Sequence, residues 1–153
     1  MSLFVKYLCV LGLSMTPVLE LRAAVPWGVA SGLPLLPVLV VSIIGNMLPV
    51  PFILCFVHKL LHWMKGKNRF LGQVAEKLEQ RAADKGEILE KYAMLGLFIL
   101  VAVPLPGTGA WTGALVATLF RLPMKYAVPT IFGGVTTAGI LMTLLSYGVD
   151  MLL

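Results

Sequence analysis

Apolar residues form four long stretches along the chain, and one extended polar region separates the first two stretches from the last two. The apolar stretches run over 3–32, 33–57, 92–120 and 124–151, and the polar region runs over 58–91. A helix that crosses a bilayer needs about 20 apolar residues, so every stretch is long enough to span. The pattern predicts an all-α integral membrane protein with a single membrane domain over residues 1–153.

Stretches 33–57 and 124–151 are predicted to be crossing helices. The first contains several prolines together with Gly45 and Asn46. We expect it to be kinked and packed against protein, where backbone groups freed by the prolines can find partners. The last stretch contains four glycines, which let another helix approach closely. Both helices are therefore expected to be packing partners in a small bundle.

The other two apolar stretches are interrupted near their centres. Pro17 breaks the first stretch, which also contains Glu20 and Arg22, and a "PLPGTG" turn over 104–109 breaks the third. Each stretch either crosses the membrane once with a break at mid-depth, or forms a re-entrant hairpin. Such a hairpin consists of two half-helices that enter and leave the membrane on the same side.

Basic residues are concentrated in the polar region. Eight of the twelve lysines and arginines lie in 58–91, and this bias places the connector in the cytoplasm. Helical spacing of apolar residues over 70–82 predicts an amphipathic surface helix, broken near Gly86. If both interrupted stretches are hairpins, the short link with Arg121 and Lys125 also lies in the cytoplasm. The hairpin arrangement therefore agrees better with the charge rule.

The two halves of the chain resemble each other. In each half an interrupted apolar stretch precedes one long helix rich in glycine and proline, giving repeat 1 over about 3–57 and repeat 2 over about 92–151. With one crossing per repeat, the second copy is inverted relative to the first, an arrangement typical of secondary transporters. Corresponding residues are 85 to 89 positions apart: Pro17 and Pro104, Glu20 and Gly107, Gly28 and Gly113, Pro34 and Pro123, Gly45 and Gly134.

Composition agrees with a membrane protein and argues against several other classes. The chain is 59% hydrophobic and only 12% charged, against roughly 25% charged in soluble domains. The net charge of +5 comes mainly from residues that flank apolar stretches, so membrane lipids are expected partners and nucleic acid is not. No nucleophile–base set, P-loop or zinc motif is present, so we expect no enzyme activity, no cofactor and no metal.

Glu20 and Arg22 are the leading candidates for a functional site. Both lie inside an apolar stretch, where a charge is costly unless it is paired or reached by water. We therefore expect them to face a cavity, with Glu20 able to take up a coupling proton. The alternative is an Arg–Glu pair that only fixes the tip of the hairpin.

The second break offers backbone groups rather than charge. A half-helix that begins near Ala110 would direct unpaired amides at an anionic group, which Arg22 would complement, so a phosphate or carboxylate is the expected substrate element. The alternative is a helix break packed against its counterpart in the other repeat. The candidate residues here are the prolines, glycines and threonines of the turn: Pro104, Pro106, Gly107, Thr108, Gly109 and Thr112.

The hypothesis of a functional site depends less on the remaining candidate residues. Asn46 either lines the cavity or forms a hydrogen bond with a neighbour. His58 and His62 share a helical face, but no third metal ligand follows them. The tryptophans are interpreted as anchors at the membrane interface: Trp27, Trp63 and Trp111.

Three stretches together carry a family resemblance: "PVLELRAAVPWGVASG" (17–32), "GNMLPVPFI" (45–53) and "PLPGTGAWTGAL" (104–115). They resemble the Putative small multi-drug export protein family and, more distantly, the DedA family of membrane proteins. The resemblance implies two re-entrant hairpins that meet at the membrane centre, each followed by a crossing helix. For DedA-like proteins it also implies proton-linked handling of lipids, including polyprenyl-phosphate carriers.

The resemblance also implies roles for particular residues. The charged positions of the first hairpin fall on Glu20 and Arg22, and the turn of the second hairpin falls on 104–109. The chain departs from the DedA pattern at Gly107, where the second hairpin has no acidic residue.

The sequence thus predicts a multi-pass transporter of the inner membrane. It would be a secondary transporter, coupled to protons, that moves a small or lipid-like anionic substrate while its two repeats alternate access. Lipid scrambling, drug export and a non-transporting scaffold are the alternatives, although Arg22 would repel a cationic drug. The small interior volume and the glycines of the last stretch are compatible with a homodimer.

Overall fold

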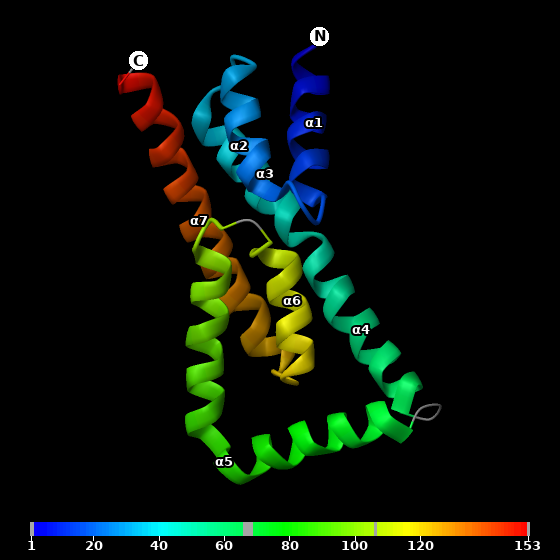
Figure 1. The fold of residues 1–153 in the computed structure, drawn as a ribbon. Helices are drawn as coiled ribbons and strands as arrows, with labels where there is room; N and C mark the ends of the chain where they lie inside the picture. The colour runs from blue at the N-terminus through cyan, green and yellow to red at the C-terminus, as the bar shows by residue number, and fades with distance from the viewer. Residues whose placement is uncertain (1, 66–68, 106, 153) are drawn as a thin grey trace.

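The computed structural model describes residues 2–65, 69–105 and 107–152, and all regular elements in these ranges are helices. The expected all-α class is confirmed. Two hairpins, α1–α2 and the last part of α5 with α6, pack beside the long helices (Figure 1). In chain order the helices are α1 (Leu3–Met15), α2 (Glu20–Ala30), α3 (Leu35–Met47), α4 (Pro49–Lys65), α5 (Arg69–Ala102), α6 (Ala110–Leu119) and α7 (Met124–Leu152).

Two helical stretches in the described ranges are long and apolar enough to cross a membrane. They are Leu35–Leu60, which continues from α3 into α4, and Met124–Tyr147 within α7. The first is interrupted at Leu48, directly before Pro49, because proline cannot donate a helical hydrogen bond. The two stretches coincide with the crossing helices predicted from the apolar pattern.

Large apolar side chains cover much of the outer surface of the bundle. Val18 is 81% exposed, Leu36 and Phe52 are each 73% exposed, and Phe4 is 72% exposed. Soluble proteins rarely present so many large apolar side chains together. Lipid is the solvent that this surface fits.

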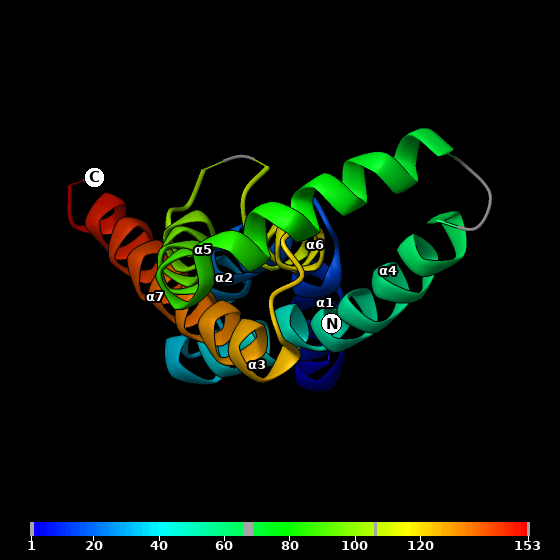
Figure 2. The same cartoon turned by 90° about the horizontal axis from the view of Figure 1, so that it is seen from below.

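Helix α5 combines the polar connector with the first arm of the second hairpin. The helix continues through Gly86, where a break was expected, because a single glycine costs only about 1 kcal/mol in a helix. Instead of breaking, α5 bends. Its first part lies across one end of the bundle, and its last part runs along α7 (Figures 1 and 2).

The second interrupted stretch folds back on itself. Helix α6 returns from the tip of the hairpin toward the end of the bundle where the connector lies (Figure 1). The link between α6 and α7 is therefore at the connector end. The link between α2 and α3 lies at the opposite end, together with the start of α1 and the end of α7.

Helix α2 ends in a Schellman motif, in which two backbone amides after the helix bond back to its last turn. The N–H of Gly32 donates to the carbonyl oxygen of Val29 at 2.9 Å, and the N–H of Leu33 donates to that of Gly28 at 3.2 Å. Gly32 takes the left-handed conformation that the motif requires, with φ of 79°. Pro34 follows and begins the turn into α3.

Helix α6 ends in the same motif. The N–H of Arg121 donates to the carbonyl oxygen of Thr118 at 3.0 Å, and the N–H of Leu122 donates to that of Ala117 at 2.9 Å. Arg121 takes the left-handed conformation here, with φ of 53°. Pro123 follows and leads into α7, so the two hairpins end with the same backbone geometry.

Each long helix approaches its own hairpin closely at a glycine. A Cβ atom at Gly45 would collide with Ser14 of α1, and one at Gly134 would collide with Val101 of α5. In each half the contact joins the long helix to the first arm of the hairpin. Glycine at these two positions therefore sets the spacing between the helices.

Candidate functional site at the hairpin tips

The two helix breaks meet at the centre of the molecule, in a contact called the tip junction from here on. Its members are Met15, Glu20 and Arg22 from the first hairpin and Val103, Thr108, Gly109 and Trp111 from the second. In Figure 1 the break between α1 and α2 and the break between α5 and α6 lie close to each other, near the mid-length of α7. The Leu21 side chain lies beside Gly139 of α7, and the Val101 side chain lies against Gly134. Both tips therefore contact the central part of the Met124–Tyr147 stretch.

Glu20 begins α2 and reaches across to the second tip. The residue is 3% exposed, and its Oε1 atom accepts a hydrogen bond of 3.3 Å from the backbone N–H of Trp111. The carboxylate also fills the space beside Gly109, where a Cβ atom would overlap it. The φ angle of Glu20 is 49°, a left-handed conformation that costs about 1–2 kcal/mol for a non-glycine residue. Packing between the tips holds Glu20 in this conformation.

Arg22 binds the loop between α5 and α6. Its Nη1 atom donates to the carbonyl oxygen of Thr108. Its Nη2 atom donates to the Thr108 hydroxyl at 2.8 Å and to the carbonyl oxygen of Val103 at 3.2 Å. The planar guanidinium can make these bonds together because its donors form a fixed fork. Arg22 therefore fastens the loop of the second tip to α2.

The two charges match the helix ends that they contact. Helix α5 ends at Ala102, so the carbonyl oxygen of Val103 that Arg22 binds lies just beyond a helix C-terminus, where the helix dipole is negative. Glu20 binds an amide in the first turn of α6, where the dipole is positive. The first hairpin thus supplies a cation and an anion to the two ends exposed by the second break.

Two further polar side chains lie buried on α3. Asn46 and Ser42 are each 0% exposed and lie one helical turn apart. Within the described part of the chain, the amide oxygen and nitrogen of Asn46 and the hydroxyl of Ser42 make no hydrogen bond. The Asn46 amide lies near the Glu20 carboxyl without reaching hydrogen-bond geometry. Buried polar atoms without partners are costly in a protein interior, so this cluster is suited to bind water or a polar solute.

The structure places the predicted residues of the second break in different roles. Helix α6 begins at Ala110, as the sequence predicts. The Thr112 hydroxyl donates to the carbonyl oxygen of Gly107 at 2.8 Å, which closes the loop onto α6. Pro104 lies half-buried in the loop, whereas Pro106 lies outside the described residues.

Trp111 is a site residue that the sequence interpretation missed. The structure places it in the first turn of α6, at the tip junction beside Glu20, rather than at an end of the bundle where interface anchors would lie. Its indole Nε1 atom donates to the carbonyl oxygen of Met15 at 3.1 Å. Trp111 therefore contacts both sides of the first break, through Met15 and Glu20. Ser42 was also missed, because a single serine in an apolar helix forms no sequence motif that would indicate a site.

The fold and the buried charges together define a helical membrane protein with a polar site at its centre. The chain belongs to the family described as Putative small multi-drug export protein, whose model matches residues 20–141. The matched region includes Glu20, Arg22 and the second helix break, the whole first candidate span and most of the second. Neither the curated proteins nor the solved structures contain a match to the chain.

Proposed function

We propose that the protein is a proton-coupled secondary transporter for an anionic substrate, either a small solute or a lipid headgroup. One observation carries the proposal: the buried Glu20 carboxylate occupies the N-terminus of α6, where an anionic substrate would bind. Arg22 contacts the same junction from α2. The family description, which names an export protein, agrees with transport and does not describe an enzyme.

An inverted repeat of two re-entrant hairpins accounts for this junction. Both hairpins end in the same Schellman motif, and each long helix packs on its hairpin at a glycine, Gly45 or Gly134. These shared features support a common origin of the halves, and the opposed hairpin openings in Figure 1 support inversion. Contacts of Leu21 and Val101 with the centre of α7 support a position of the tips near the bilayer midplane.

Coupling follows from competition between Glu20 and the substrate. While ionised, Glu20 satisfies the amide of Trp111, so a substrate anion meets an occupied helix end. Protonation removes this charge, and the positive end of α6 then becomes available to the substrate. Proton and anion therefore bind together, and either one raises the affinity for the other. Asn46, near the carboxyl, offers unpaired polar atoms for a hydrogen bond with the protonated carboxyl or with water, and Ser42 offers a further hydroxyl one turn away on α3.

The charge distribution supports a cytoplasmic connector in the inner membrane. The α6–α7 link with Arg121, and the start of α7 with Lys125, lie at the connector end, so the basic residues of these segments gather on one side. Lys6 belongs to the opposite end, near the start of α1. This arrangement is the one expected for two hairpins and two crossings.

Transport in proteoliposomes tests the proposal. Vesicles with a trapped pH-sensitive dye are given inorganic phosphate or water-soluble, short-chain phosphatidic acid, with and without an imposed pH gradient. We expect anion-dependent proton entry with the wild-type chain and none with Glu20→Gln, which keeps the shape of the side chain. Glu76→Gln makes the same change in the connector and should transport like the wild type.

Other outcomes separate the alternatives. Anion-dependent proton entry that survives Glu20→Gln would reject the role of Glu20. Movement of fluorescent phospholipid between leaflets at the same rate with and without the gradient would favour scrambling. If neither anion and no lipid moves in vesicles that hold folded protein, a scaffold function replaces the proposal.

A further inference from the structure

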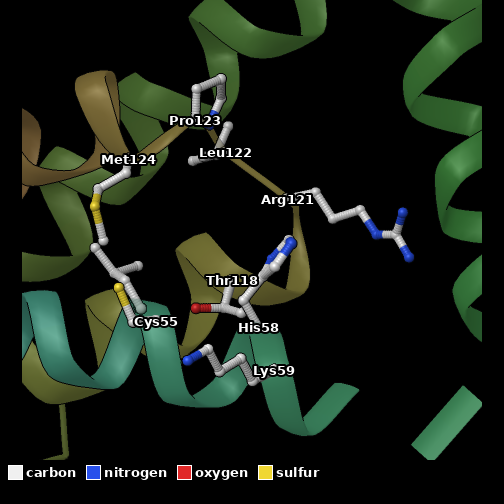
Figure 3. Close-up of a pocket in the computed structure, with 9 residues that line it drawn as sticks. Cys55, His58, Lys59, Thr118, Arg121, Leu122, Pro123 and Met124 are labelled. Atoms are coloured by element: carbon white, nitrogen blue, oxygen red, sulfur yellow. The ribbon is translucent and has the colours of Figure 1, made fainter. Parts of the chain in front are cut away.

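A second feature lies away from the tip junction, between α4 and the link that joins α6 to α7. It is a cavity of about 410 Å³, within the range of small-molecule sites. The close-up in Figure 3 shows the side chains that surround it. The lining residues are Leu54, Cys55, His58, Lys59, Thr118, Arg121, Leu122, Pro123 and Met124.

The lining changes from apolar to polar along α4. Leu54 of α4 and Thr118 of α6 are both buried, so this part of the cavity is enclosed by protein. His58 and Lys59 follow about one turn later, and both are exposed. Lys59 lies next to Leu60, the last residue of the first candidate span, which is the level expected for lipid headgroups.

Exposed apolar residues are the chain neighbours of two lining residues, Cys55 and Arg121. Phe56 of α4 is 67% exposed and Phe120, in the α6–α7 link, is 54% exposed, so the surface around the cavity is apolar. A lipid chain could enter from the bilayer without crossing water. A free phosphate ion would gain nothing from the apolar walls. The guanidinium of Arg121 points away from the other lining side chains in Figure 3, so the charge at the cavity comes from α4.

We propose that this cavity binds one anionic phospholipid from the leaflet on the connector side. An acyl chain lies against Leu54 and Leu122, and the phosphate lies at Lys59, with His58 as a further hydrogen-bond donor. Basic pockets between membrane helices on the cytoplasmic side are suited to acidic headgroups. The site is separate from Glu20, so the inference does not rest on the transport proposal.

Lipid binding to the full chain in detergent tests the site. Native mass spectrometry counts bound lipid during titration with dioleoyl phosphatidylglycerol or with zwitterionic dioleoyl phosphatidylcholine. We expect one phosphatidylglycerol to bind preferentially, and Lys59→Gln to weaken it by about fivefold, the effect of one lysine near an acidic headgroup. Lys125→Gln removes a charge from the same end of the molecule but outside the cavity, and should leave the preference intact.

The two native cysteines allow a second readout without changing the cavity. Cys9→Ser leaves Cys55, which lines the cavity, as the single thiol. Phosphatidylglycerol should slow its reaction with N-ethylmaleimide, and inorganic phosphate should not. Equal binding of the two lipids, equal losses in Lys59→Gln and Lys125→Gln, or protection by phosphate alone would each overturn the site. Glu20→Gln should bind the lipid normally, so failure here is distinct from failure of the transport proposal.

Discussion

The backbone N–H of Trp111 donates a hydrogen bond to the Glu20 carboxylate across 3.3 Å, and this contact joins residues 91 positions apart in the chain. It connects the first residue of α2 to the first turn of α6. A helix N-terminus needs acceptors for its free amides, and here a side chain from the other hairpin provides one. The state of a single carboxyl group is thereby linked to the contact between the two hairpins.

The first prediction concerns the response of Trp111 to pH. In a Trp27→Phe/Trp63→Phe background, Trp111 is the single tryptophan. Protonation of Glu20 removes the charge that α6 favours, so the contact loosens and the Trp111 emission should shift to the red in one step on acidification. Fluorescence titration of the chain in detergent measures this shift.

The matched variant for that titration is Glu20→Gln in the same background. Its amide oxygen can still accept from the Trp111 N–H, but the side chain does not titrate. The emission should then be independent of pH, apart from acid unfolding. A red shift of equal size in this variant would show that a group other than Glu20 causes the change.

The second prediction concerns the stability that Arg22 contributes through its hydrogen bonds to the loop between α5 and α6. Arg22→Gln removes hydrogen bonds to two carbonyl oxygens and a hydroxyl, and charged hydrogen bonds contribute about 1.5–3 kcal/mol. We expect the free energy of unfolding to fall by about 2 kcal/mol, as measured by circular dichroism during titration with denaturing detergent. Arg22→Lys should recover only part of this loss, because lysine lacks the fork.

A double-mutant cycle identifies the partner of Arg22. Thr108→Ala removes the hydroxyl that accepts from Nη2 and leaves the carbonyl oxygen in place. The cost of Arg22→Gln should shrink by about 0.5 kcal/mol or more in this background. Strict additivity would mean that the side-chain contact contributes nothing to stability.

The third prediction separates steric contact from backbone strain at the second tip. Gly107 and Gly109 have φ angles of 80° and 143°, so alanine is strained at both positions, by about 1–3 kcal/mol. Only at Gly109 would the added Cβ overlap the Glu20 carboxylate, since nothing lies within 4 Å at Gly107. Gly109→Ala should therefore destabilise the fold more than Gly107→Ala in the same unfolding titration. Removing the carboxylate with Glu20→Ala should reduce the difference in unfolding free energy between the two alanine variants. A difference of unchanged size would contradict the contact between Gly109 and the Glu20 carboxylate.

The fourth prediction concerns the sides of the membrane. Single cysteines replace Lys6, Lys77 or Lys125 in a chain without Cys9 and Cys55. The α6–α7 link and the connector lie at the same end of the bundle, so positions 77 and 125 should react with an impermeant maleimide from the cytoplasmic side. Position 6 should react from the other side. Labelling of position 125 together with position 6 would mean that the second stretch crosses fully.

Much of the fold follows from local signals in the sequence. Pro17 and the 104–109 turn cannot continue a helix, and the structure breaks α1 and α5 at these places. The two candidate spans could be predicted because the apolar stretches that contain them are long enough to cross a bilayer. Gly86 misled the interpretation, because a glycine is a weak helix breaker and α5 continues through it.

The site was harder to predict because its partners come from distant parts of the chain. The burial of Glu20 and the partial burial of Arg22 could be inferred from their apolar neighbours. Periodicity could not reveal that they bind the helix ends of the other hairpin. Trp111 fits an interface anchor by composition alone, and only the tertiary fold places it beside Glu20.

The tip junction is unequal, since the acid and the base both come from the first half, whereas the second half presents backbone. Two identical halves would place two carboxylates at one point, and their repulsion would separate the tips. Gly107, the residue that corresponds to Glu20, carries no charge and so avoids that conflict, and Gly109 leaves room for the Glu20 carboxylate. The junction therefore depends on the difference between the two hairpins, because one supplies the charged side chains and the other supplies the backbone groups that they bind. A copy of either hairpin could not replace the other.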